Sequence, residues 1–556
     1  MTASDATINA RALVIDRASE TRSALGMALA EAGVATIDYA NRQTTALGLI
    51  QNHDYDVVLC EYDLGGGMDG VHLFEACQQH YLLKPSCIFM MVTGERRQAQ
   101  VMGAAELIPD GYLLKPFSTG DLIERLNRAQ RRKARFRTID NAVRAGDYLG
   151  AVTACDREMA LRAANETEDF LRMKTFLLLR LGEHQSAAES STAALDLRES
   201  AWARMGLGKA RFGLKDLDGA RACFEAVKRD HELAMESYDW LARTLTAQGE
   251  MATAQATLSE ALQRSPLAAA RQTALGRLAE RNGELETAEN ALLYALNLSR
   301  GSFWPDISLY CELGRVQLAR DDIGGARRTI QRLRREVPTS NESVEPICEL
   351  IEAAVLEKLD ERKASAELFE HACETLREQE DPLPGVLIEA ARQAYTRRRQ
   401  EAGAALVRSA LGAASDDPAV LASVESLYHG LGEPEIGQQM VAEVTRDLSQ
   451  LNNDAVIAVR NGNLSAAADM FINALHGRSG NVQLLLNAIN TLLSCVNQQG
   501  WNEHYMDMAQ RYLARVRKQD PTNGKARQLA DAMRRTRTRF GIDAGSQPQQ
   551  QPPAAA

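Results

Sequence analysis

Residues 57–70 read VVLCEYDLGGGMDG, and this stretch decides how the N-terminal part of the chain folds. Four apolar residues, Val57 to Cys60, are followed at once by Glu61 and, two residues later, by Asp63. A short apolar run with β-branched residues predicts a buried strand, and the glycines after it predict a loop that closely approaches another group. The strand therefore ends in a carboxylate, whose role depends on what lies at the ends of the other strands.

Strand-like and helix-like patterns alternate from residue 11 to about residue 130. Five such alternations predict an α/β fold, a doubly wound, five-stranded parallel sheet covered by helices on both faces. Functional groups in such sheets gather beyond the carboxyl ends of the strands, where Asp16, Glu61, Thr93 and Lys115 fall. The expected strands are Ala12–Ile15, Ala35–Tyr39, Val57–Cys60, Ile88–Val92 and Tyr112–Leu114, and the expected helices are Ser19–Ala32, Gln43–Asn52, Val71–Tyr81, Arg96–Gly103 and Thr119–Arg128.

The chain beyond about residue 132 has the pattern of paired amphipathic helices that repeat every 34 residues. Small residues recur at fixed positions of the repeat, and a four-residue insertion near 303–306 interrupts it once. This pattern resembles the tetratricopeptide repeat and predicts an all-α superhelical solenoid over 132–540 with about 10–12 helix pairs. The repeating positions are Leu207, Gly208, Ala220 and Phe224; Leu241, Ala242, Ala254 and Leu258; Leu275, Gly276, Ala288 and Leu292; and Leu313, Gly314, Ala326 and Ile330.

The first part of the chain resembles the receiver domain of bacterial two-component response regulators. The resemblance covers about residues 11–130 and rests on LVID at 13–16, MDG at 68–70, VTG at 92–94 and LKPF at 114–117. It implies a flavodoxin-like fold in which two acidic residues after the first strand hold Mg²⁺. It also implies an aspartate after the third strand that accepts a phosphoryl group, a Thr and a Lys that sense it, and a cis bond before Pro116.

The sequence departs from the receiver pattern at two positions. Arg17 stands where the second acidic residue is expected, and Glu61 stands where the phosphoacceptor aspartate is expected. If Asp16 and Glu61 face Arg17 and Lys115, the formal charge of the pocket is zero, and an ion pair at about 4 Å contributes roughly 4 kcal/mol before desolvation. We therefore expect no cofactor and no Mg²⁺; a metal held by Asp16 and Glu61 is the alternative.

Three hypotheses follow for the carboxylate at the strand end. Glu61 reaches one methylene further than aspartate, so it could pair with Lys115 or bond to Thr93 and fix the pocket in one state without phosphorylation. Alternatively, it satisfies Lys115 and signals nothing. A third hypothesis makes Asp63 a relocated phosphoacceptor, because the loop through 65–67 is one residue longer than usual.

The resulting domain organisation has four parts. These are a receiver-like (pseudo-receiver) domain over 9–128, a basic helical linker over 129–140, the solenoid over 132–540 and a disordered Gln/Pro/Ala-rich tail over 541–556. The stretch RAQRRKARFR at 128–137 carries six cations in ten residues. We interpret it as the exposed face of a joining helix, with nucleic-acid or membrane binding as the alternative.

One helix position of the repeat carries a cation in four successive copies. A ladder of this kind in a groove suits bidentate capture of carboxylates, which predicts an acidic peptide segment as partner. The alternative is that these cations only make the protein surface hydrophilic and bind no partner. The four positions are Lys209, Arg243, Arg277 and Arg315.

Composition sets the remaining limits. The 556 residues carry a net charge of −10, which argues against a nucleic-acid partner, and the nine cysteines form no CxxC. There is no long uncharged apolar run and no signal-peptide pattern, so we expect a cytoplasmic protein without membrane partners.

These patterns predict a signalling adaptor without enzymatic activity, in which a phosphorylation-independent receiver is coupled to a scaffold that binds protein partners. A histidine kinase or another regulator is a candidate partner. Three alternatives remain: a conventional phosphorelay regulator modified near Glu61 or Asp63, a phosphatase of another regulator that uses Gln272 or Gln317, and an assembly cochaperone.

Overall fold

The computed structural model describes residues 10–64, 70, 73–74, 77, 82–94, 109–144, 147–163, 167–232, 234–300, 306–338, 341–379, 381–414, 417–475, 482–519 and 523–542. The chain divides into two compact units, residues 1–309 and 310–556, and the boundary falls within the expected solenoid. The expected helix over 96–103, the loop over 65–67 and nearly all of the tail lie outside the described residues, as does most of the helix over 71–81.

The N-terminal part contains a five-stranded parallel sheet with strand order β2-β1-β3-β4-β5. The strands are β1 (Arg11–Ile15), β2 (Thr36–Ala40), β3 (Val57–Glu61), β4 (Ile88–Thr93) and β5 (Gly111–Leu114). All four strand pairs are parallel, so the carboxyl ends lie along one edge. The predicted doubly wound fold is confirmed.

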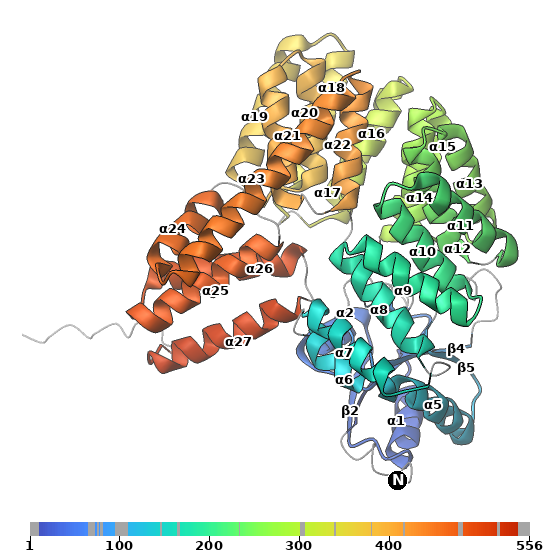
Figure 1. Cartoon of the computed structure of the whole chain (residues 1–556). Helices are drawn as coiled ribbons and strands as arrows, with labels where there is room; N and C mark the ends of the chain where they lie inside the picture. Colours follow the sequence, from blue (N-terminus) through green and yellow to red (C-terminus); the bar gives the residue numbers. More distant parts are fainter. Residues whose placement is uncertain are drawn as a thin grey trace, which may run out of the picture. The chain divides into compact units, whose positions relative to one another are not determined.

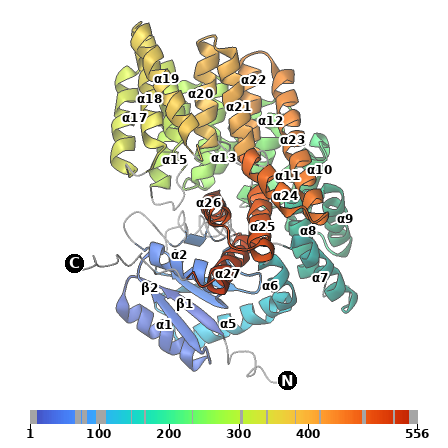
Figure 2. The ribbon, with the colours of Figure 1, turned by 90° about the vertical axis from the view of Figure 1, so that its left-hand side faces the viewer.

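Alternate residues of the central strands enter two separate hydrophobic cores, as the period of two in a strand requires. Ala12 and Val14 pack with α1 (Ser19–Glu31) and α5 (Thr119–Lys133), whereas Leu13 and Ile15 pack with α2 (Gln43–Asn52). Figure 2 shows the sheet between these two layers. Burial on both faces explains why the strands read as continuous apolar runs.

Antiparallel helices make up the rest of the first unit (Figure 1). The first helices of three successive pairs begin 34 residues apart: α10 (Ala201–Gly213), α12 (Met235–Ala247) and α14 (Ala269–Arg281). Their partners begin 34 residues apart as well. The other helices of this region are α6 (Arg137–Arg144), α7 (Tyr148–Ala160), α8 (Glu168–Leu181), α9 (His184–Leu197), α11 (Leu217–Asp230), α13 (Met251–Arg264) and α15 (Leu285–Ser299).

Small residues and left-handed turns produce these helix pairs. A Cβ on Gly208 or Gly276 would clash with Phe224 or Leu292 of the partner helix, so the absence of a side chain sets the close approach. The turn inside each pair needs a residue with positive φ, which glycine adopts without steric cost. Glycine supplies it at Gly182, Gly249, Gly283, Gly432 and Gly462, whereas Lys215, Asp321, Asp360 and Arg398 adopt it despite their side chains.

The second unit continues the paired helices with one exception. Helix α23 (Pro434–Arg460) has 27 residues and packs against α22 and α24. It is longer than expected because no glycine or proline interrupts residues 438–461. The other helices are α16 (Leu309–Ala319), α17 (Ile323–Glu336), α18 (Val344–Lys358), α19 (Arg362–Glu378), α20 (Pro384–Thr396), α21 (Gln400–Ala414), α22 (Pro418–Gly430), α24 (Leu464–Leu475), α25 (Val482–Gln499), α26 (Glu503–Gln519) and α27 (Gly524–Arg539).

The receiver sheet joins the first helix pair without a flexible connection. Helix α5 passes through the short 3₁₀ helix η1 (Ala134–Phe136) directly into α6. Phe136 and Ile139 are buried in the core formed with α7 and α8. The cations of this segment whose side chains are described lie largely at the surface, as the linker interpretation expected, but the helix that bears them is packed rather than merely connecting.

One buried contact fixes α6 to the receiver sheet. The backbone N–H of Ser86, just before β4, donates to Asp140 Oδ1 at 3.0 Å, and the Ser86 hydroxyl donates to Asp140 Oδ2. Both residues are buried. Lys133 Nζ also lies 3.3 Å from Asp110 Oδ2, which accepts the Phe89 N–H of β4.

We predict that Asp140→Ala loosens the junction between the receiver and the first helix pair. The substitution leaves a buried N–H and a buried hydroxyl without an acceptor, which costs about 1–3 kcal/mol. Hydrogen exchange of the α6 and β4 amides in the full chain should become faster. Asn141→Ala, at an exposed neighbouring position, should leave it unchanged, and equal protection in both variants would contradict a role for the contact.

Candidate functional site

The predicted site residues lie at the carboxyl ends of four different strands. Asp16 follows β1, Glu61 ends β3, Thr93 ends β4 and Lys115 follows β5. The order of the sheet places β1, β3, β4 and β5 side by side, so these ends share one edge. The Lys115–Pro116 peptide bond is cis, as expected, and the Lys115 N–H donates to the Thr93 carbonyl at 2.9 Å.

The Lys115 ammonium group lies between two carboxylates. Its Nζ is 2.7 Å from Asp16 Oδ2 and also donates to Glu61 Oε2. The side chains of Asp16 and Glu61 are 3% and 11% exposed, so water screens these pairs little. Burial lowers the pKa of Lys115, but hydrogen bonds to the two carboxylates outweigh it, and the pKa lies above its ordinary value. The Lys115 ammonium group therefore brings together three of the predicted site residues: Asp16, Glu61 and Lys115 itself.

The second carboxylate oxygen of Glu61 turns back to its own chain. Glu61 Oε1 accepts the Tyr62 N–H at 2.7 Å and the Asp63 N–H at 3.4 Å. The extra methylene of glutamate permits this fold-back while Oε2 reaches Lys115. Burial raises the pKa of Glu61, and the nearby Asp16 carboxylate adds to this, although Lys115 opposes it.

Arg17 does not join these charges as the sequence suggested. Its side chain is 58% exposed, and the ion pair it forms with a described residue is to Asp63, at 3.9 Å. The buried group of Asp16, Glu61 and Lys115 therefore has a formal charge of −1 rather than zero. The correction has a simple cause: a guanidinium loses less hydration at the surface than it would between buried groups. The uncompensated negative charge is consistent with the raised pKa of Glu61.

These residues do not form a good site for a divalent cation. Hard cations need several oxygen ligands, and both carboxylates already accept hydrogen bonds from Lys115. Among the described residues there is no group of three or more Asp, Glu, His or Cys side chains that could hold a metal.

Two further features shape this edge of the sheet. A Cβ on Gly70 would clash with the Glu61 carbonyl and the Cys60 sulfur, so the glycine of the MDG motif is required by close packing. Tyr112 on β5 was not among the predicted site residues. Burial raises its pKa to about 12, and its buried hydroxyl has no hydrogen-bond partner in the described part of the chain.

The cation ladder is largely neutralised by the chain itself. Lys209 Nζ lies 2.6 Å from Glu236, Arg277 lies 3.9 Å from Asp306, and Arg315, in the second unit, lies 3.1 Å from the buried Glu389. Arg243 is exposed, and its guanidinium carbon lies 5.0 Å from the ring centre of Trp240. An acidic peptide in the groove would have to compete with three existing carboxylates. The sequence could not show these pairs because the partners are 27 to 74 positions away.

The two glutamines of the phosphatase alternative lie in different environments: Gln317 is buried, whereas Gln272 is partly buried. Gln317 is buried and accepts the Thr329 hydroxyl hydrogen at 2.7 Å between α16 and α17, where it cannot orient a water molecule on a partner. Gln272 donates to the Pro266 carbonyl at 3.4 Å.

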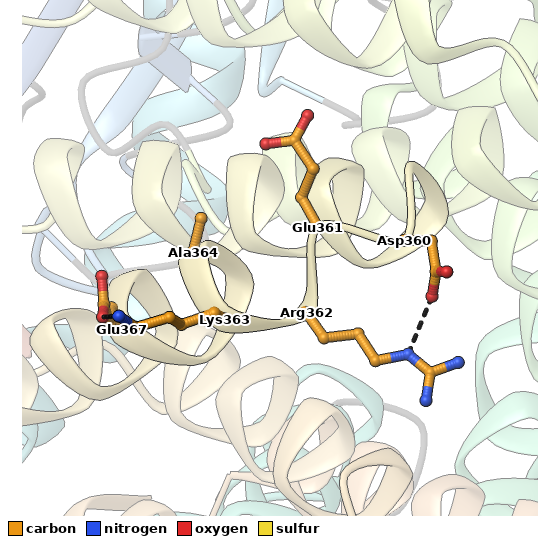
Figure 3. Close-up of a pocket in the computed structure, with 6 residues that line it drawn as sticks. All are labelled: Asp360, Glu361, Arg362, Lys363, Ala364 and Glu367. Atoms are coloured by element: carbon orange, nitrogen blue, oxygen red, sulfur yellow. Dashed lines mark hydrogen bonds and ion pairs between the residues drawn. The ribbon is translucent and has the colours of Figure 1, made fainter.

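A surface hollow at the α18–α19 turn also offers no reactive group (Figure 3). Its charged residues pair locally: Arg362 Nε lies 2.8 Å from Asp360, and Lys363 lies 3.8 Å from Glu367. These side chains are all exposed, so the pairs contribute little stability.

Known proteins resemble mainly the N-terminal part of this chain. Residues 12–127 match the family model described as response regulator receiver domain. The chemotaxis protein CheY-3 of Vibrio cholerae is 28% identical over 120 residues, which are 22% of this chain and 91% of that protein. The chemotaxis protein CheY of Pseudomonas aeruginosa is 28% identical over 116 residues, 21% of this chain and 92% of that protein.

The solved structure of a tetratricopeptide repeat protein from Parabacteroides merdae aligns with 49% of this chain, and the alignment includes 99% of that protein's chain. Its sequence identity is 13% and its TM-score is 0.33. The sheet topology and strand-end residues define a receiver-type α/β domain followed by helical repeats. The N-terminal part of this chain is a response regulator receiver domain, as the sequence predicted. Among the described helices, none is both long enough and apolar enough to span a membrane.

We predict that Lys115→Met destabilises the receiver by about 3–5 kcal/mol, because it leaves two buried carboxylates without their cation. Adding Glu61→Gln should restore part of this loss by removing one of the charges. Glu61→Gln alone should cost about 1 kcal/mol, since Asp16 still pairs with Lys115. Hydrogen exchange of the β1 and β3 amides reports receiver stability within the full chain. Unchanged protection in Lys115→Met would contradict the electrostatic tie.

The raised pKa of Glu61 also predicts a pH dependence. The folded receiver binds this proton at a higher pH than the unfolded chain, whose ordinary value is 4.5, so the contribution of Glu61 to stability rises as pH falls through the folded pKa. Glu61→Gln should remove this slope at pH values above 4.5, when urea unfolding is followed by hydrogen exchange corrected for the intrinsic exchange rate at each pH. Parallel slopes in the two proteins would rule out Glu61 as the titrating group.

Proposed function

We propose that this protein is a signalling adaptor of the two-component type, in which a receiver that works without phosphorylation is coupled to helical repeats that bind protein partners. The observation that carries the proposal is the position of Lys115 between Asp16 and Glu61. In a conventional receiver this lysine responds to the phosphoryl group. Here a carboxylate of the chain already occupies it, so the pocket has one stable arrangement.

The alternative of a phosphoacceptor at Asp63 has less support. The Asp63 side chain is 75% exposed and forms its ion pair with Arg17 at the surface. A phosphoryl group on Asp63 would lack the contact with Lys115 through which a receiver responds to phosphorylation. We further propose that the chain has no catalytic reaction of its own and acts in the cytoplasm; the buried environment of Gln317 supports the first point against the phosphatase alternative.

We expect no phosphoryl transfer from acetyl phosphate to the wild-type chain with Mg²⁺ present, because position 61 is a glutamate held by Lys115. The double variant Arg17→Asp with Glu61→Asp restores the acidic pattern of a conventional receiver and should become labelled at position 61. Intact-mass measurement of the full chain detects the adduct.

Asp63→Asn in the wild-type background is the control for this experiment. Mg²⁺-dependent labelling of the wild type that disappears in Asp63→Asn would establish the phosphorelay alternative and refute the proposal. If neither the wild type nor the double variant is labelled, Arg17 and Glu61 are not what prevents phosphoryl transfer to this chain.

A further inference from the structure

Charge is distributed very unevenly along this chain. Residues 503–542, which form α26 and α27, contain ten Lys and Arg residues against four Asp and Glu residues, although the whole chain has a net charge of −10. Helix α25, on which both helices pack, has no charged residue. Eight of the ten cations are arginines. This local excess was not singled out by the sequence analysis, because the acidic composition of the rest of the chain hides it.

Packing turns the cations of α27 towards solvent. Ala526, Leu529, Met533 and Thr536 form one face of the helix and are buried against the neighbouring helices. Arg534 and Arg535 lie away from that face and are exposed, and the Arg534 side chain is 80% accessible. The helix is therefore anchored by this face, and Arg534 and Arg535 remain accessible to a partner.

Hydrogen bonds hold the arginine-bearing helices in register. Arg537 Nη2 donates to Gln510 of α26 at 2.5 Å, and Asn497 of α25 donates to the Thr536 hydroxyl at 3.1 Å. Arg517 of α26 is exposed as well. These bonds fix the helices, so that binding a ligand would order the exposed side chains but not the backbone that carries them.

We propose that the α26–α27 surface, whose exposed cations include Arg517, Arg534 and Arg535, binds an acidic segment of a partner protein. This inference rests on the adaptor function and names the surface and the chemistry of the partner. Of the predicted ladder, Arg315 pairs with the buried Glu389, which a partner carboxylate would displace less readily than the exposed Asp531 beside Arg534.

The physical chemistry favours an acidic protein segment over other anions. Arginine binds carboxylates in a bidentate, planar geometry. A nucleic-acid duplex is long and would experience the net negative charge of the remaining chain, whereas a short peptide within a Debye length of about 8 Å experiences mainly the local excess. A membrane surface would require apolar side chains beside the cations, and Ile542 is the one exposed large hydrophobic residue among the described residues of 503–542.

The existing ion pair on this surface does not prevent binding. Arg534 pairs with Asp531 one helical turn away, and both side chains are more than half exposed. Exposed pairs of this kind contribute little, so a partner carboxylate can displace Asp531.

The test measures binding of a fluorescein-labelled decapeptide of alternating Asp and Glu to the full chain by anisotropy. We expect Arg517→Glu with Arg534→Glu to weaken binding about tenfold or more, and added salt to weaken wild-type binding. The matched control, Lys209→Glu with Arg243→Glu, makes the same charge change in the groove and should bind nearly as well as the wild type.

Each other outcome overturns the inference. Loss of binding only in the groove variant would return the acid-binding site to the ladder. Equal binding by all three proteins, or none by the wild type, would show that this surface does not recognise acidic peptides. Tighter binding of a 20-base-pair duplex or of phosphatidylserine vesicles, lost in the Arg517/Arg534 variant, would assign the surface to that anion. None of these results alters the phosphoryl-transfer test, so the adaptor function is judged separately.

Discussion

A single ammonium group ties together the carboxyl ends of three strands. Lys115 at the end of β5 binds Asp16 at the end of β1 and Glu61 at the end of β3, and its backbone N–H binds the end of β4. Asp16 is buried, and Glu61 and Lys115 are partly buried, so water screens these charges little. The first two residues after β3 bind the same carboxylate through the amides of Tyr62 and Asp63. This arrangement is the basis of the proposal that the receiver works without phosphorylation.

The amino end of β4, opposite the strand ends that carry the lysine pocket, makes the contact with the repeats. Ser86 lies before β4 and Thr93 ends it, so one short strand joins the α6 contact to the lysine pocket. The receiver therefore contacts the first helix pair of the repeats through Ser86 and Asp140, whereas Phe136 and Ile139 are buried within the repeats themselves.

Patterns local in sequence predicted most of the fold. Apolar runs predicted β1, β3 and β4, because burial on both faces leaves a strong signal. The edge strands β2 and β5 are more exposed and were predicted from the alternation of strands and helices. The 34-residue period placed the helix pairs around α10 to α15, since each repeat needs small residues at the same positions. Helix α23 was missed as one helix because its length follows from the absence of Gly and Pro between two repeats rather than from a motif.

The site was harder to predict because its decisive contacts join distant residues. The strand-end positions of Asp16, Glu61 and Lys115 could be inferred, but the outward turn of Arg17 depends on solvent exposure, which the sequence does not encode locally. The partners of Lys209 and Arg315 lie on other repeats. The buried bond of Asp140 to Ser86 spans 54 positions and had no sequence signal at all.

Helices α5, η1 and α6 follow one another without a break, so the number of residues in this segment sets the rotation of α6 about the helix axis relative to the receiver sheet. Each residue added to a helix turns everything after it by about 100° around the axis. An insertion of one residue after Lys133 would swing Asp140 away from Ser86 and carry Ile139 out of its core, whereas a flexible linker would absorb the same insertion. The length of this segment is therefore constrained in steps of whole helical turns, and a receiver can be exchanged onto these repeats only in matching phase.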